Sequence, residues 1–309
     1  MISKTSKDLN EKVEEHELNK EIRDRIKEII QEEEIKNVLN NEIICEPNDD
    51  LKKKLNINYK IKNKEDYLKL YEFAKNYDHT KFLKETYNFF GWLFNKDDLD
   101  YIAKYLQICI KGSRPLYLHG YIVSSALYKY IHDSKNIEYI TILETGTARG
   151  FADIVMGEVL RKYNIKGKIH TIDHLNHEKN LNWNCIDAPN GGKISRHKIL
   201  ERWSYIRDNY INFINGDSNE VLMNLNIGRI NFAFLDGPHN YKELFFELNY
   251  VEKNQKSGDI IICDDYTITQ FPEICKAIDE FLSYNKYEST FFYGYDGTKK
   301  RGYVYMKKK

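Results

Sequence analysis

From residue 139 onward the chain alternates between short β-branched or aromatic runs and longer stretches with helical periodicity. Five strands are predicted, at 139–144, 168–173, 211–215, 230–236 and 259–264. The predicted helices lie between and after them, at 151–163, 195–209, 218–224, 241–254 and 272–285. Such alternation is typical of parallel βαβ units. Two last β-rich runs, 287–295 and 302–307, are joined by the hairpin signal Asp296-Gly297-Thr298. The predicted fold class is α/β, with five parallel strands plus a C-terminal antiparallel hairpin.

The part of the chain before these strands has a different pattern. Residues 8–40 are dense in Glu, Lys and Arg, contain no Pro or Gly, and carry a narrow apolar stripe at helical spacing. The stripe predicts a helix that either lies on its own domain or pairs with a second copy in a homo-oligomer. Further helices are predicted at 64–76, 81–94, 97–111 and 120–131. We therefore expect a charged helical extension and linker at 1–54 and a helical cap region at 55–132.

Composition narrows the class of protein. The 47 basic and 47 acidic residues give a formal net charge of zero, which does not favour nucleic acid or an anionic membrane as a partner. The five cysteines are scattered and lack C-x-x-C spacing, which fits a reducing compartment better than a disulfide framework or a zinc site. No apolar run approaches the ~18 residues of a spanning helix. We expect a cytoplasmic protein that binds neither nucleic acid nor membranes.

The turn after the first predicted strand carries the clearest ligand-binding signal. It runs from Glu144 through Gly146 and Thr147 to Gly150. Glycine at both ends lets the backbone pass close to a ligand and direct amide N–H groups at it. A dinucleotide site normally shows G-x-G-x-x-G, whereas this turn is G-x-x-x-G with an acid two residues ahead. The spacing therefore disfavours a nicotinamide cofactor.

Glu-x-Gly-x-x-x-Gly after the first strand resembles motif I of the Rossmann-like S-adenosylmethionine-dependent methyltransferases. The predicted order of five parallel strands and a final hairpin resembles the sheet of the same family. The resemblance implies that residues 133–309 form an S-adenosylmethionine-binding methyltransferase domain. It also implies that the cofactor contacts Glu144, Gly146, Thr147 and Gly150.

Two more acids stand at predicted strand ends. Asp173 ends the second strand, where a carboxylate can accept hydrogen bonds from ribose hydroxyls. After the third strand, the resemblance implies that Asp217 lies against the adenine amine, with Ser218 beside it. The alternatives are that Asp173 caps a loop and that Asp217 or Ser218 caps the next helix.

Acids after the fourth and fifth strands predict a metal site. Asp236 ends the fourth strand, and Asp264 and Asp265 end the fifth. On neighbouring parallel strands these carboxylates meet at one edge, where they repel unless a cation neutralises them. Mg²⁺ is bound by few carboxylates together with waters and substrate oxygens. The pattern, with His239 and Tyr241, resembles the metal-dependent O-methyltransferases, in particular the group of macrolide-sugar O-methyltransferases and cephalosporin-hydroxylase-like proteins.

This resemblance implies methyl transfer from S-adenosylmethionine to a hydroxyl of a small molecule such as a sugar or secondary metabolite. Asp236 is then a residue of the cofactor, metal and catalytic sites together. His239 is the predicted general base, because neutral imidazole at pH 7 can accept the hydroxyl proton. The alternatives are that His239 packs its loop and that the acids bind no metal. A metal-independent methyltransferase and a non-catalytic cofactor-binding or assembly protein therefore stay open.

The segment between the second and third predicted strands, from residue 174 to residue 210, is unusually long. Long connections often carry function, so we predict that residues 175–193, within the segment 174–194 before the helix at 195–209, form a lid that contributes to the acceptor pocket. The alternative is a surface excursion without a role.

Overall fold

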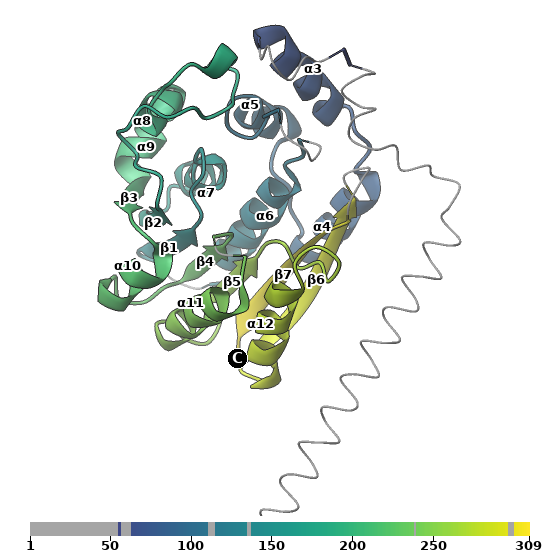
Figure 1. The fold of residues 1–309 in the computed structure, drawn as a ribbon. Coiled ribbons are helices and arrows are strands. Elements are labelled where there is room, and N and C mark those ends of the chain that lie inside the picture. The colour runs from purple at the N-terminus through teal and green to yellow at the C-terminus, as the bar shows by residue number, and fades with distance from the viewer. Residues whose placement is uncertain (1–54, 57–62, 111–114, 135–136, 238, 296–299) are drawn as a thin grey trace, which may run out of the picture. The chain divides into compact units, whose positions relative to one another are not determined.

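The computed structural model describes residues 55–56, 63–110, 115–134, 137–237, 239–295 and 300–309 (Figure 1). All of these residues belong to one compact unit, Pro47–Lys309. The predicted helix at 8–40, the extension at 1–54 and the hairpin turn at 296–298 lie outside the described residues. The domain boundaries near residues 54 and 132 stay predictions.

A seven-stranded sheet forms the centre of this unit (Figure 1). Its strands are β1 (Ile140–Thr145), β2 (Gly167–Asp173), β3 (Ile211–Asn215), β4 (Phe232–Leu235), β5 (Ile260–Cys263), β6 (Tyr287–Tyr295) and β7 (Lys300–Lys308). The spatial order is β3-β2-β1-β4-β5-β7-β6. Strands β1 to β5 are parallel, whereas β7 is antiparallel to both β5 and β6. The predicted α/β fold with a closing hairpin is confirmed, and the chain order reverses between β1 and β4, where such sheets bind ligands.

Helices cover both faces of the sheet (Figure 1). They are α3 (Lys64–Lys75), α4 (Thr80–Phe90), α5 (Lys96–Leu106), α6 (Leu118–Asp133), α7 (Phe151–Lys162), α8 (Arg196–Ile199), α9 (Ser204–Tyr210), α10 (Ser218–Asn224), α11 (Tyr241–Lys253) and α12 (Pro272–Ser283). Helices α10, α11 and α12 pack together on one face. Helices α4 to α7 and α9 pack on the other face.

The strand sequences explain why both faces are covered. In β4, Phe232 and Phe234 belong to one core cluster, and Ala233 and Leu235 belong to the other. A strand that is buried on both sides has no polar positions, so its sequence is a continuous apolar run. Such runs made β4 and β5 recognisable, although both strands are shorter than predicted at each end.

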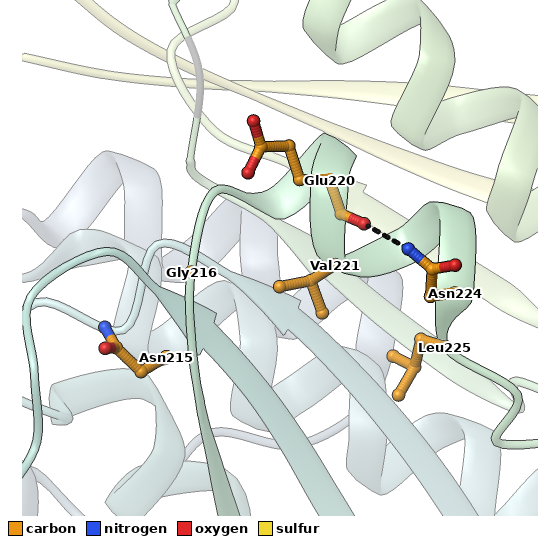
Figure 2. Close-up of a pocket in the computed structure, with 6 residues that line it drawn as sticks. All are labelled: Asn215, Gly216, Glu220, Val221, Asn224 and Leu225. Carbon is orange, nitrogen blue, oxygen red and sulfur yellow. Dashed lines mark hydrogen bonds between the residues drawn. The ribbon is translucent and has the colours of Figure 1, made fainter.

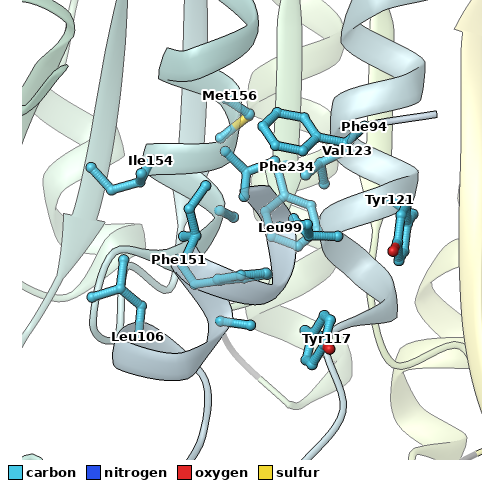
Figure 3. Packing of buried hydrophobic residues seen from close by; sticks show 14 of the residues in the cluster. Phe94, Leu99, Leu106, Tyr117, Tyr121, Val123, Phe151, Ile154, Met156 and Phe234 are labelled. Carbon is cyan, nitrogen blue, oxygen red and sulfur yellow. The ribbon is translucent and has the colours of Figure 1, made fainter. Parts of the chain in front are cut away.

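The cluster between the sheet and helices α5 to α7 is tightly packed (Figure 3). Phe151 of α7 and Leu99 of α5 both reach Gly120 of α6, where an added Cβ would lie 2.8 Å and 3.0 Å from their side chains. A methyl group there has no room, because protein interiors are close-packed. The described N-terminal helices are therefore part of the core beneath the glycine turn.

The connection between β2 and β3 is the part of the fold that the sequence predicted least well. A single helix at 195–209 is wrong, because a 3₁₀ turn, η2 (Leu200–Trp203), separates α8 from α9. The 3₁₀ geometry places residues three apart on one side, and Leu200 and Trp203 are both buried. Before it, η1 (Pro189–Gly191) follows four residues of the first core cluster, Trp183, Cys185, Ile186 and Ala188. The segment is therefore not a surface excursion.

None of the described helices is long and apolar enough to cross a membrane. The described cysteines, Cys109, Cys185, Cys263 and Cys275, are buried, and none of them forms a disulfide with another described residue. Burial raises the pKa of the Cys263 thiol well above its ordinary value, so this side chain stays protonated.

Candidate active site

The glycine turn lies between the ends of β1 and β4. Gly146 and Gly150 have φ angles of 90° and 85°, which L side chains rarely adopt. An added Cβ on Gly146 would lie 2.1 Å from the carbonyl oxygen of Asp236. The first glycine is therefore required for close approach to the end of β4. The turn predicted to bind the cofactor and the first predicted metal ligand are neighbours.

Glu144 is the second-last residue of β1, beneath this turn, and belongs to a buried polar network. Thr171 donates a hydrogen bond of 2.5 Å to Glu144 Oε2, and its hydroxyl also lies 2.6 Å from that of Thr147. Burial raises the pKa of Glu144 well above its ordinary value, and the neighbouring Asp153 carboxyl raises it further. Burial also raises the pKa of Asp153. One of these two carboxyl groups therefore carries a proton near neutral pH.

On the opposite face of the sheet, Thr145 donates a hydrogen bond of 2.9 Å to Glu247 Oε2 of α11. Glu247 is fully buried, and burial raises its pKa to about 7. Sequence reasoning missed this residue. The signal was available, because Glu247 occupies the apolar stripe of α11 that Leu244, Leu248 and Val251 define.

Asp173 ends β2, as predicted, but hydrogen bonds from other residues of the chain already use most of the acceptor capacity of its carboxylate. Its Oδ2 accepts hydrogen bonds from the Ala148 amide at 2.8 Å and from Arg196 at 2.9 Å. Its Oδ1 accepts one from the Leu175 amide at 2.7 Å. Each carboxylate oxygen can accept two hydrogen bonds, so Oδ1 has capacity for one more donor, such as a ribose hydroxyl. The loop-capping interpretation holds, and the ribose role stays a prediction.

Arg196 is the second residue that sequence reasoning missed. Its guanidinium is buried and also donates a hydrogen bond of 2.7 Å to the carbonyl of Ala148, inside the glycine turn. It lies over the ring of Trp183 at 5.1 Å. Arg149 of the turn donates to the carbonyls of Leu106 and Trp183. Hydrogen bonds from the two arginines connect the glycine turn to the β2–β3 connection and to the end of α5.

Asp217 caps α10, because its Oδ1 accepts hydrogen bonds from the amides of Asn219 and Glu220 at 3.0 Å and 3.2 Å. Ser218 is the first residue of that helix. The capping alternative is confirmed for Asp217, and the adenine role of both residues stays a prediction. Figure 2 shows the hollow beside them, lined by Asn215, Gly216, Glu220, Val221, Asn224 and Leu225. Asp217 is not one of its lining residues, so the hollow lies alongside the predicted adenine position.

Three predicted catalytic or metal residues come together at the ends of β4 and β5. One ligand atom each of Asp236, His239 and Asp265 lies within 4.8 Å of the other two. His239 Nε2 and Asp265 Oδ2 are 2.9 Å apart, and this hydrogen bond raises the pKa of His239 above its ordinary value. We call these three residues the acidic–histidine group.

Asp264 is not a member of this group. Its Oδ1 accepts a hydrogen bond of 2.6 Å from the backbone amide of Asp265, and burial raises its pKa to about 7. Asp265 has a φ angle of 61°, which turns the chain sharply after the strand. Of the two consecutive acids predicted to bind metal, the structure thus places Asp265 with Asp236, and His239 takes the third position.

A parallel sheet of this order, with a glycine turn at its switch point and acids after β2 and β4, defines a Rossmann-like ligand-binding domain. Residues 143–266 match a family model described as a methyltransferase domain. This part of the chain, which is less than half of its length, is therefore similar to a methyltransferase domain. The matched residues include the end of β1, the glycine turn and the acidic–histidine group.

Several solved structures are similar to this chain, and the first of them shares its fold. The O-methyltransferase NovP is 15% identical, with a TM-score of 0.50, and the alignment covers 68% of this chain and 98% of that one. The O-methyltransferase TomG from Streptomyces achromogenes is 13% identical, with a TM-score of 0.48 and coverage of 75% and 99%. An O-methyltransferase from Bacillus cereus is 14% identical, with a TM-score of 0.46 and coverage of 77% and 96%. No curated protein sequence matches.

Proposed function

We propose that the chain transfers a methyl group from S-adenosylmethionine to a hydroxyl of a small molecule, such as a sugar or secondary metabolite, with the help of a divalent cation such as Mg²⁺. The observation that carries this proposal is the acidic–histidine group, whose ligand atoms lie within 4.8 Å of one another. It adjoins the glycine turn through the contact between Gly146 and Asp236. The two carboxylates fit a hard divalent cation that keeps waters or substrate oxygens as its other ligands, and the imidazole lies beside them as the proton acceptor.

The residues around the glycine turn fit the cofactor in part. Asp173 Oδ1 retains capacity for one ribose hydroxyl, and Asp217 stands at the end of β3. Glu144 and Asp153 lie directly beneath the turn, and a carboxylate in this place favours a cationic methionine group above it. Arg196 holds the carbonyl of Ala148 and so fixes the backbone of the turn.

His239 is the proton acceptor in this proposal. Methyl transfer needs an oxygen that is aligned with the sulfonium carbon and has lost its proton. The hydrogen bond to Asp265 orients the His239 ring, which is half exposed at the edge of the sheet. A bound cation would polarise the acceptor hydroxyl and lower its pKa. Asp236 and Asp265 would hold that cation, and His239 would take the proton.

Calorimetry and a methyl-transfer assay test this proposal together. S-adenosylmethionine should bind to the full chain, and product formation from a panel of hydroxyl compounds should require Mg²⁺. Asp265→Asn should bind the cofactor normally and lose turnover, whereas Asp97→Asn, at an exposed acid of α5, should behave like wild type. Turnover that survives both chelation and Asp265→Asn would rule out the metal role, and absence of cofactor binding would rule out the function.

The hydrogen bond between His239 and Asp265 also favours a second candidate, a metal-independent methyltransferase. A histidine that a carboxylate orients can act as a general base without a cation. In that case chelation should leave turnover unchanged, while Asp265→Asn should reduce it by mispositioning His239. The same assay therefore distinguishes the two candidates.

A further inference from the structure

A second group of ligand-type side chains lies near the end of β2, in the connection that leads to β3. A ring nitrogen of His177, a ring nitrogen of His197 and a carboxylate oxygen of Glu178 all lie within 4.8 Å of one another. His197 Nδ1 is 3.6 Å from Glu178 Oε1, and His177 Nε2 is 3.9 Å from the same oxygen. None of these residues takes part in the methyl-transfer proposal.

The backbone and the packing hold this group in place. The amide of His197 donates a hydrogen bond of 3.2 Å to the carbonyl of His177, so the two residues are linked although they are far apart in sequence. The His177 ring stacks on Phe213 of β3, with 3.7 Å between the ring centroids and 14° between their planes. Arg207 donates a hydrogen bond of 3.0 Å to the carbonyl of His197. The His177 ring and the backbone of His197 are therefore positioned without any contribution from a ligand.

The distances between the ligand atoms of this group suit an ion with tetrahedral coordination. Ligand atoms bound at about 2.0–2.2 Å in a tetrahedral zinc site lie roughly 3.3–3.6 Å apart. The separations of 3.6 Å and 3.9 Å to Glu178 need only a small contraction, which its exposed side chain allows. Imidazole nitrogens select zinc and its transition-metal neighbours, whereas magnesium and calcium prefer sites made of oxygen atoms.

We propose that His177, Glu178 and His197 bind one Zn²⁺ ion, or a similar transition-metal ion. The ion would link the beginning of the β2–β3 connection to α8, which lies further along the same connection. His177 Nδ1 is buried and has no hydrogen-bond partner among the described residues. A zinc-binding histidine usually donates its second N–H to an acceptor, which strengthens the site. The missing acceptor should weaken the affinity about 10- to 100-fold relative to a site that has one.

The bound ion would lie close to the residues at the end of β2 and in the glycine turn where the cofactor is proposed to bind. His197 directly follows Arg196, which holds Asp173 at 2.9 Å and Ala148 at 2.7 Å. His177 lies shortly after Asp173 on the same connection. Binding of the ion joins the beginning of the connection to α8 further along it, so it should stabilise the folded state by mass action.

The test uses the full chain after removal of bound metal. One equivalent of Co²⁺ should produce the visible absorption of a tetrahedral complex, and Zn²⁺ should displace it and raise the denaturation midpoint. His197→Ala and His177→Ala should abolish the absorption and the shift, and Glu178→Gln should weaken both. Asp265→Asn, in the acidic–histidine group, and His132→Ala, at an exposed histidine of α6, should keep them.

Zinc binding that is unchanged in His197→Ala, or lost in Asp265→Asn, would overturn the proposal, and so would the absence of zinc binding to wild type. His177 packs against Phe213, so its replacement could unfold the connection. Since the side chains of His197 and Glu178 are 42% and 72% exposed, their variants should fold and they decide the outcome. Metal binding does not depend on turnover, so this result is independent of the proposed function.

Discussion

Arg196 places a buried positive charge between the glycine turn and the acid at the end of β2. Replacing it with methionine keeps the apolar bulk against Trp183 but leaves Asp173 without its cationic partner. Breaking a buried ion pair from one side costs about 3–5 kcal/mol, so Arg196→Met should lower the free energy of unfolding by that amount. Urea denaturation measures it.

Arg161→Met is the matched control, because Arg161 pairs with Glu158 at the surface and such pairs contribute less than about 0.5 kcal/mol. Equal losses of stability in the two variants would show that Arg196 makes no special contribution. A loss of stability in Arg196→Met with unchanged cofactor affinity would mean that Arg196 supports the fold and not the turn.

The raised pKa of Glu247 predicts how the free energy of unfolding depends on pH. Its folded pKa of about 7 lies above its ordinary value of 4.5, so the folded state holds a proton that the unfolded state has lost between these pH values. Stability that this group contributes is fully present below pH 4.5 and is lost as the pH rises through 7. Glu247→Gln removes the titration and should therefore be more stable than wild type at pH 8, by up to about 3 kcal/mol.

Urea denaturation at pH 5 and pH 8 measures this difference. Glutamine keeps an oxygen for the hydrogen bond from Thr145, so the two proteins should differ little at pH 5. A difference in stability that stays the same at both pH values would contradict the assignment of the titration to Glu247.

At the scale of elements, the β1–α7 turn depends on the absence of a side chain at Gly146. Gly146→Ala would place a methyl group 2.1 Å from the Asp236 carbonyl oxygen and would also strain the backbone, which has a φ of 90°. The turn must move away from β4, so the variant should lose cofactor binding and much of its stability. Calorimetric titration with S-adenosylmethionine and urea denaturation measure the two effects.

Gly228→Ala is the control variant, because it measures the cost of backbone strain without any steric overlap. Gly228 has a φ of 71° with open space around it, so its replacement costs only the backbone strain of roughly 1–2 kcal/mol. If Gly146→Ala costs no more than Gly228→Ala and still binds the cofactor, the contact between the turn and β4 has no functional importance.

The elements that the sequence predicted well are those whose periodicity comes from burial. Apolar runs marked β4 and β5, and amphipathic stripes marked α11 and α12. The helix at 195–209 failed, because tertiary packing of Leu200 and Trp203 favours a 3₁₀ turn that no propensity signals. Local periodicity therefore identified the layers of the fold but not the course of its longest connection.

The sequence predicted which strand ends carry the site residues. It did not predict the directions in which their side chains point. Asp264 and Asp265 follow one strand, and only the φ of 61° at Asp265 decides which carboxylate reaches Asp236. Likewise, Arg196 is far from Asp173 in sequence, and no local pattern shows that the two meet. These contacts depend on tertiary geometry, which a single sequence does not display.

At the scale of the whole molecule, every described core residue lies within the unit Pro47–Lys309. Its two clusters cover the two faces of the sheet, and the described helices before β1 belong to one of them. A unit with its own complete core can fold alone. We therefore predict that a chain beginning at Pro47 folds and binds S-adenosylmethionine with the affinity of the full chain.

Circular dichroism should give the same denaturation midpoint for both chains, and calorimetry the same cofactor affinity. Light scattering then tests the predicted pairing through residues 8–40: a full chain that is dimeric should become monomeric when it begins at Pro47. A shortened chain that aggregates or melts earlier would show that residues 1–46 complete the core. In that case residues 1–46 of the predicted extension contribute to folding, and the shortened chain is not an independent folding unit.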